Sequence, residues 1–89
     1  MTRVVLDRAA GELTLSGHAG SAEAGRDLVC AALSALMYTA AAQPGARSAM
    51  GEGWCVIAAD RAALAAVCRG FGLLAESFPR HVSYREVSA

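Results

Sequence analysis

Two side chains in the first third of this sequence could carry out nucleophilic chemistry together. His18 and Cys30 are about a dozen residues apart, joined by a segment rich in glycine and alanine. A cysteine attacks carbonyl carbons as its thiolate, and a neighbouring imidazole can accept the thiol proton and stabilise that thiolate. The pair therefore predicts acyl transfer, with Cys30 as the nucleophile and His18 as the general base.

The same cysteine also has an unreactive interpretation. Cysteine is among the most buried residue types, and Cys30 precedes an Ala-Ala-Leu run in which a small core side chain would fit. Cys55 and Cys68 stand in apolar surroundings, and we expect both of them in the core. Ser34 lies one helical turn beyond Cys30, where a hydroxyl more often bonds to its own backbone. One histidine and one cysteine do not make a three- or four-ligand set, so we expect no metal and no cofactor.

The residues before His18 predict two short strands that position it. Residues 2–7 contain the apolar run Val-Val-Leu of a buried strand. Residues 12–18 alternate, with Leu13 and Leu15 on one face of the strand and His18 on the other. The two strands form an opening hairpin, and the alternation directs the His18 side chain toward solvent or a cleft.

The residues around Cys30 predict a helix over 25–42. This range is rich in Ala, Leu and Met, has no interior Gly or Pro, and is followed by Gln-Pro-Gly at 43–45. Residues three and four apart share a helix face. One face of this helix carries Asp27, Cys30, Ser34 and Met37, and another carries Val29, Leu33, Leu36 and Ala40. The second face is the better candidate for the core.

The rest of the sequence predicts a second hairpin, a second helix and a last strand. Residues 46–50 and 54–59 flank Gly-Glu-Gly, a composition typical of a hairpin turn. Asp60 caps a helix over 61–77, in which Gly70 and Gly72 predict either an early end or close packing against a neighbour. Residues 81–87 favour an edge strand.

This order of elements, ββαββαβ, predicts an α+β fold. The sheet is built from two hairpins and a closing strand, and two helices cover it in one domain formed by residues 1–89. The 55% of hydrophobic residues excludes a disordered tail, and the balance of eight basic and eight acidic residues argues against direct binding of nucleic acid. No apolar run of about 20 residues could span a bilayer. Three cysteines without paired spacing suit a reducing compartment, so we expect a cytoplasmic protein.

The segment from 17 to 36 resembles a known family signature. Gly-His-Ala-Gly at 17–20 and Gly-Arg-Asp-Leu-Val-Cys-Ala-Ala-Leu-Ser-Ala-Leu at 25–36 closely resemble the motif of the ribosomal-processing cysteine protease family, Prp. The resemblance implies a homodimeric cytoplasmic endopeptidase. Its substrate would be the short N-terminal extension of the bacterial large-subunit ribosomal protein near the peptidyl-transferase centre. It also implies that His18 and Cys30 are catalytic and that Asp27 and Ser34 support them.

The segment between the two catalytic candidates is expected to be a substrate loop. Its glycines predict a mobile segment that becomes ordered on substrate binding, formed by Gly17, Ala19, Gly20, Ser21 and Gly25. The chain departs from the family at Ser21 and Ala24, where family members commonly carry aromatics. Asp27 could orient the histidine or bind the substrate backbone. The alternative function is a non-catalytic ribosome-associated binding module or dimeric scaffold, in which Cys30 is buried.

Overall fold

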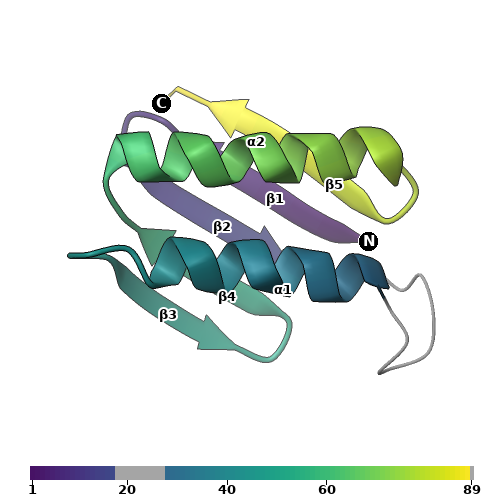
Figure 1. Cartoon of the computed structure of the whole chain (residues 1–89), viewed down its shortest axis with the longest axis horizontal. Coiled ribbons are helices and arrows are strands. Elements are labelled where there is room, and N and C mark those ends of the chain that lie inside the picture. Colours follow the sequence, from purple (N-terminus) through teal and green to yellow (C-terminus); the bar gives the residue numbers. More distant parts are fainter. Residues whose placement is uncertain (18–27, 89) are drawn as a thin grey trace.

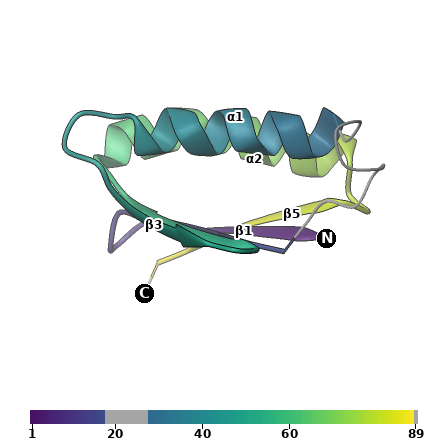
Figure 2. The ribbon, with the colours of Figure 1, turned by 90° about the horizontal axis from the view of Figure 1, so that it is seen from below.

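The computed structural model describes residues 1–17 and 28–88, which form a five-stranded sheet with two helices on one face (Figures 1 and 2). The elements follow the predicted order ββαββαβ, which confirms the α+β fold. Their bounds are β1 (Thr2–Asp7), β2 (Glu12–Ser16), α1 (Leu28–Ala41), β3 (Arg47–Gly51), β4 (Trp54–Ala58), α2 (Arg61–Ser77) and β5 (Val82–Val87).

The strands are ordered β3-β4-β2-β1-β5 across the sheet. All neighbours are antiparallel except β1 and β5, which pair in parallel from Thr2 and Val82 to Asp7 and Val87. The last strand is therefore an edge strand, as the sequence predicts. The two strands that lie at the edges of the sheet are β3 and β5.

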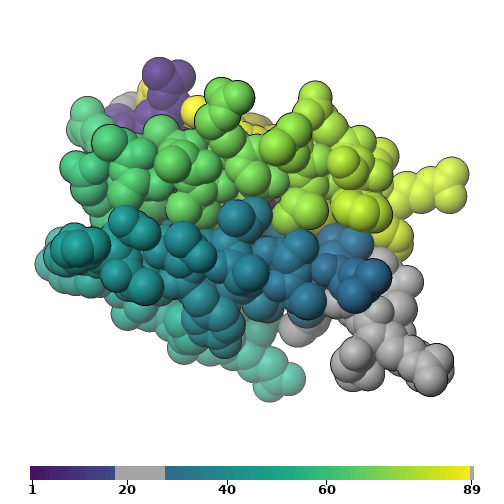
Figure 3. Space-filling view, viewed as in Figure 1, coloured from purple at the N-terminus to yellow at the C-terminus, as the bar shows by residue number. Residues whose placement is uncertain are grey.

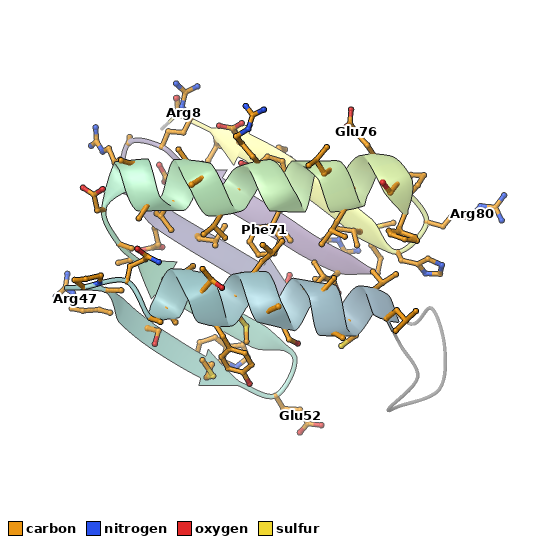
Figure 4. All side chains as sticks on the ribbon, viewed as in Figure 1. Arg8, Arg47, Glu52, Phe71, Glu76 and Arg80 are labelled. Atoms are coloured by element: carbon orange, nitrogen blue, oxygen red, sulfur yellow. The ribbon has the colours of Figure 1, made fainter. Side chains whose placement is uncertain are left out.

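The core lies between the helices and one face of the sheet. The face of α1 that carries Val29, Leu33 and Ala40 is buried, which confirms the predicted core stripe. Phe71 of α2 is fully buried, and its side chain points between the two helices in Figure 4. The space-filling view shows α1 and α2 lying side by side along their whole length (Figure 3). The other core side chains are Val4, Leu6, Leu13, Leu15, Cys55, Ile57, Leu64, Val67, Cys68 and Val82.

Two glycines explain where the structure refines the predicted elements. Strand β2 ends at Ser16 and not at residue 18, because Gly17 adopts a left-handed backbone with φ 85°. A Cβ atom at Gly17 would also collide with the backbone carbonyl of Met1. Helix α2 spans the predicted residues and does not end early. Its Gly70 packs closely on Leu36 of α1, where a Cβ would lie 2.9 Å from both terminal methyl carbons.

Capping fixes the start of α2. The Asp60 carboxylate accepts hydrogen bonds from the backbone N–H groups of Ala62 at 3.1 Å and Ala63 at 3.3 Å. For α1, residues 25–27 of the predicted helix lie outside the described part of the chain.

Candidate active site

Cys30 lies close to the N-terminal end of α1 and beside the buried face of that helix. It is the third residue of α1 as described, and it is half-buried, whereas its neighbour Val29 belongs to the core. Ser34 and Met37 follow on the same side of the helix and are also half-buried. The described part of the predicted stripe, Cys30, Ser34 and Met37, therefore shares one side of α1, and Cys30 is not one of the core residues.

These three side chains line a cavity of about 280 Å³ between α1 and the turn that joins β3 to β4. Gly17, the residue before His18 in the sequence, lines the same cavity. Cys55 of β4 also contributes to its lining. The cavity thus brings together residues from the end of β2, the start of α1 and the β3–β4 hairpin.

The rest of the cavity lining includes large hydrophobic residues that remain exposed. Tyr38 of α1 is 60% exposed, Met50 of β3 is 48% exposed and Trp54 of β4 is 47% exposed. The indole of Trp54 lies against Gly51, since a Cβ there would collide with the ring. Gly51 and Trp54 pair with each other and alternate with the pair Met50 and Cys55, so this indole lies on the face of the sheet opposite the helices. Exposed hydrophobic side chains grouped around a cavity are typical of a binding site. None of these three residues is predicted as a site residue from the sequence, because they belong to three different elements.

Several predicted site residues lie outside the described part of the chain. They are the catalytic candidate His18, the supporting candidate Asp27 and the loop residues Ala19, Gly20, Ser21 and Gly25. Of the predicted site, the described residues include Cys30, Ser34 and Gly17, and all three line the same cavity.

The other two cysteines are in the core, as predicted. Burial raises the pKa of both the Cys55 and the Cys68 thiols, which disfavours their thiolates. Cys68 also lines a larger groove of about 1160 Å³ between α2 and the β1–β5 edge, together with Arg8, Arg69 and Tyr84. Of the predicted site residues that the structure describes, none lines this groove. Size alone therefore does not identify the site, and the smaller cavity at Cys30 is the better candidate because it combines a half-buried thiol with exposed apolar walls.

The described residues contain no group of three or more His, Cys, Asp and Glu side chains that could hold a metal ion. Within the same residues, no helix is long and apolar enough to cross a membrane. The three cysteines form no disulfide.

Comparison with known proteins gives a family and several structural relatives. Residues 1–45 match the family described as "Cysteine protease Prp", and this match covers half of the 89-residue chain, including the segment that carries Cys30. The fold resembles the S. aureus ribosomal processing protease Prp, at 16% identity over 97% of both chains, with TM-scores of 0.76 and 0.67 in two structures. It also resembles the Streptococcus mutans protein SMU.848, at 26% identity over 99% of this chain and 93% of the relative, with a TM-score of 0.75. No curated protein matches this chain.

The match over half of the chain defines the protein as a cysteine protease. The matched region holds β1, β2 and α1, and all three elements contribute residues to the lining of the Cys30 cavity. The chain belongs to the Prp family.

Proposed function

We propose that this protein is a ribosomal-processing endopeptidase in which Cys30 is the nucleophile and His18 the general base. The observation that carries the proposal is the position of Cys30, half-buried at the cavity that Gly17 also lines. Gly17 directly precedes His18, so the chain leads from this cavity into the segment that holds the base. The family match covers both residues.

The proposed reaction is acyl transfer in two steps. His18 accepts the proton of the Cys30 thiol, and the thiolate attacks the carbonyl carbon of the scissile peptide bond. The tetrahedral intermediate collapses, the C–N bond breaks, and His18 returns the proton to the departing amine. Water, activated by the same imidazole, then hydrolyses the thioester and releases the thiol. Backbone N–H groups around the loop and the start of the helix are the proposed donors to the oxyanion.

Asp27 and Ser34 are proposed to support this pair. Ser34 lines the cavity one turn after Cys30, which supports a contact between its hydroxyl and a bound peptide. Asp27 either orients the histidine or binds the substrate backbone. The loop residues Gly17, Ala19, Gly20, Ser21 and Gly25 are proposed to close over the substrate.

The cavity suits one apolar side chain of a peptide. Its volume is about 280 Å³, which is smaller than typical small-molecule sites of about 300–1,000 Å³. The exposed side chains of Tyr38 and Met50 present apolar surface that would be covered by such a side chain. Binding an apolar residue there would hold the neighbouring peptide bond close to Cys30.

The proposed substrate is the N-terminal extension of a bacterial large-subunit ribosomal protein. The S. aureus relative is described as an essential ribosomal processing protease, and its structures hold a covalently linked product peptide and a substrate peptide. A covalently linked product is what a thioacyl intermediate would leave. We further propose a cytoplasmic homodimer, each chain forming one protease domain over residues 1–89, that needs no cofactor and does not bind nucleic acid directly.

Cleavage of a peptide that spans the ribosomal processing site tests the function. The Cys30→Ala variant should show no turnover, and Cys30→Ser should retain at most a trace. In the wild-type protein, iodoacetamide near pH 7 should alkylate Cys30 much faster than Cys55 or Cys68, which serve as internal controls because both are buried. Cleavage by Cys30→Ala at the wild-type rate would show that the nucleophile is another residue.

A further inference from the structure

The β3 edge of the sheet borders the candidate active site. Strand β3 pairs with β4 on one side only, and no described residue pairs with its other side. All five residues of β3 are exposed. Figure 1 shows β3 at the outer side of the sheet, beside the part of the fold that α1 covers. Met50 and Gly51, at the end of this strand, line the Cys30 cavity.

The pairing of β4 determines which backbone groups of β3 are available. The N–H of Gly17 donates to the carbonyl of Gly53 at 2.8 Å, which continues the β2–β4 ladder. Because hydrogen-bonding direction alternates along an antiparallel strand, Gly53, Cys55 and Ile57 direct their backbone groups toward β2. The intervening residues Trp54, Val56 and Ala58 therefore direct theirs toward β3.

The same alternation applies to β3. The partners of Trp54, Val56 and Ala58 in β3 are Gly51, Ala49 and Arg47. The backbone N–H and C=O groups of these three partners therefore point toward β4. Ser48 and Met50 consequently direct their N–H and C=O groups away from the sheet, at the open edge. Met50 faces the helix layer with its side chain, since its partner Cys55 is buried there and Met50 lines the cavity.

This edge has few of the features that usually prevent strand addition. Natural edge strands are protected by proline, bulges or inward-pointing charges. The β3 register with β4 is continuous over all five pairs, and the strand sequence Arg-Ser-Ala-Met-Gly has no proline and one charge at its start. The opposite edge, β5, carries Arg85 and Glu86 within the strand. The less protected edge is thus the one next to Cys30.

We infer that the substrate peptide binds as an additional strand on the β3 edge, through the backbone groups of Ser48 and Met50. The inference rests on the proposed function and identifies how that site recognises an extended peptide. At about 3.4 Å per residue, five residues of β3 span about 17 Å, which matches about five substrate residues. Side chains of an added strand alternate between faces, so every second substrate residue faces the helix layer and can enter the cavity at Met50.

Amide hydrogen exchange tests the inference without requiring turnover. The Cys30→Ala variant is mixed with a short synthetic peptide that spans the ribosomal processing site. We expect exchange at the Ser48 and Met50 amides to slow by about tenfold or more at saturating peptide. The amide of Ala49 is the internal control, because it already points toward β4 and should change little. Unchanged exchange at Ser48 and Met50 would overturn the inference.

A matched pair of variants tests it by kinetics. Ser48→Pro removes the outward N–H without breaking the β3–β4 ladder, and proline is tolerated on such an edge. Ser48→Ala retains the N–H. We expect kcat/KM for the peptide to fall about five- to tenfold in Ser48→Pro relative to Ser48→Ala, which corresponds to one net hydrogen bond. The two variants should have equal thermal midpoints and equal rates of Cys30 alkylation, which would show that the fold and the thiol are intact.

The outcomes separate this inference from the proposed function. Wild-type cleavage combined with unchanged amide exchange would overturn the strand addition and leave the protease function in place. Amide protection without any cleavage by the wild-type protein would support the strand addition and contradict the protease function. Protection of Ser48 and Met50 that rises with protein concentration and needs no peptide would assign the edge to a second copy of the chain, and would also overturn the inference.

Discussion

Replacing Gly51 by alanine should displace the only tryptophan of the chain. A Cβ at Gly51 would occupy the space of the Trp54 ring atoms Nε1, Cε2 and Cζ2. Trp54 is 47% exposed, so about half of an aromatic surface of about 250 Å² is buried, equivalent to about 3 kcal/mol at about 25 cal/mol per Å². In the variant the ring loses part of this contact, which lowers the free energy of unfolding. Alanine in place of glycine raises that free energy by about 0.5–1 kcal/mol. We therefore expect Gly51→Ala to lower the free energy of unfolding by about 1–2 kcal/mol.

Tryptophan fluorescence and urea denaturation measure this effect directly. Because Trp54 is the single tryptophan, a shift of its emission toward longer wavelengths in Gly51→Ala would report the displaced ring. Gly72→Ala is the control: its Cβ would meet only Tyr84 at 3.8 Å, so stability should rise slightly and the emission should stay constant. Unchanged emission and unchanged stability in Gly51→Ala would refute the packing of the Trp54 ring on Gly51.

Two further predictions concern the core and its response to pH. Phe71 is 0% exposed and Phe78 is 40% exposed, so Phe71→Ala should cost about 3–5 kcal/mol of unfolding free energy, and Phe78→Ala about 1 kcal/mol or less. Equal thermal midpoints of these two variants would contradict the observed core. Burial raises the pKa of the Tyr84 hydroxyl and of the Cys68 thiol, and each group also interacts with the other. The folded protein therefore holds these protons more tightly than the unfolded chain does, and the stability they contribute is complete below their ordinary pKa values of about 9–10 and is lost above them. Urea denaturation should show stability falling from about pH 9 upward, with a shallower fall in Tyr84→Phe; a parallel pH dependence in that variant would exclude Tyr84 as a source.

Hydropathy patterns were sufficient to predict the fold because each element has one buried face. The alternation of Leu13 and Leu15 fixes which side of β2 meets the helices, and both are buried. The stripe of Val29 and Leu33 does the same for α1. The position of Gly70 showed the limits of local reasoning: its close contact with Leu36 depends on how two helices lie side by side, which no single segment encodes.

The cavity walls could not be predicted for a related reason. Tyr38, Met50 and Trp54 come from α1, β3 and β4, and only the β3–β4 register together with the placement of α1 brings them together. In the sequence, each is a single apolar residue in an apolar segment, which a core interpretation explains equally well. Their exposure, visible only in the folded chain, is what distinguishes them.

The position of Cys30 among the three cysteines follows from helix geometry. An α-helix turns by about 100° per residue, so a residue next to a core position lies at the border of the buried face. Val29 occupies the core position, and Cys30 follows it at this border, where the cavity opens. Cys55 shares the buried face of β4 with Ile57, and Cys68 lies four residues after Leu64 and three before Phe71 on the buried face of α2, so both thiols face the core. Of the two sequence interpretations of Cys30, an inert core residue or an accessible thiol, this geometry favours the second. A shift of α1 by a single residue would exchange Cys30 with Val29 and bury the thiol.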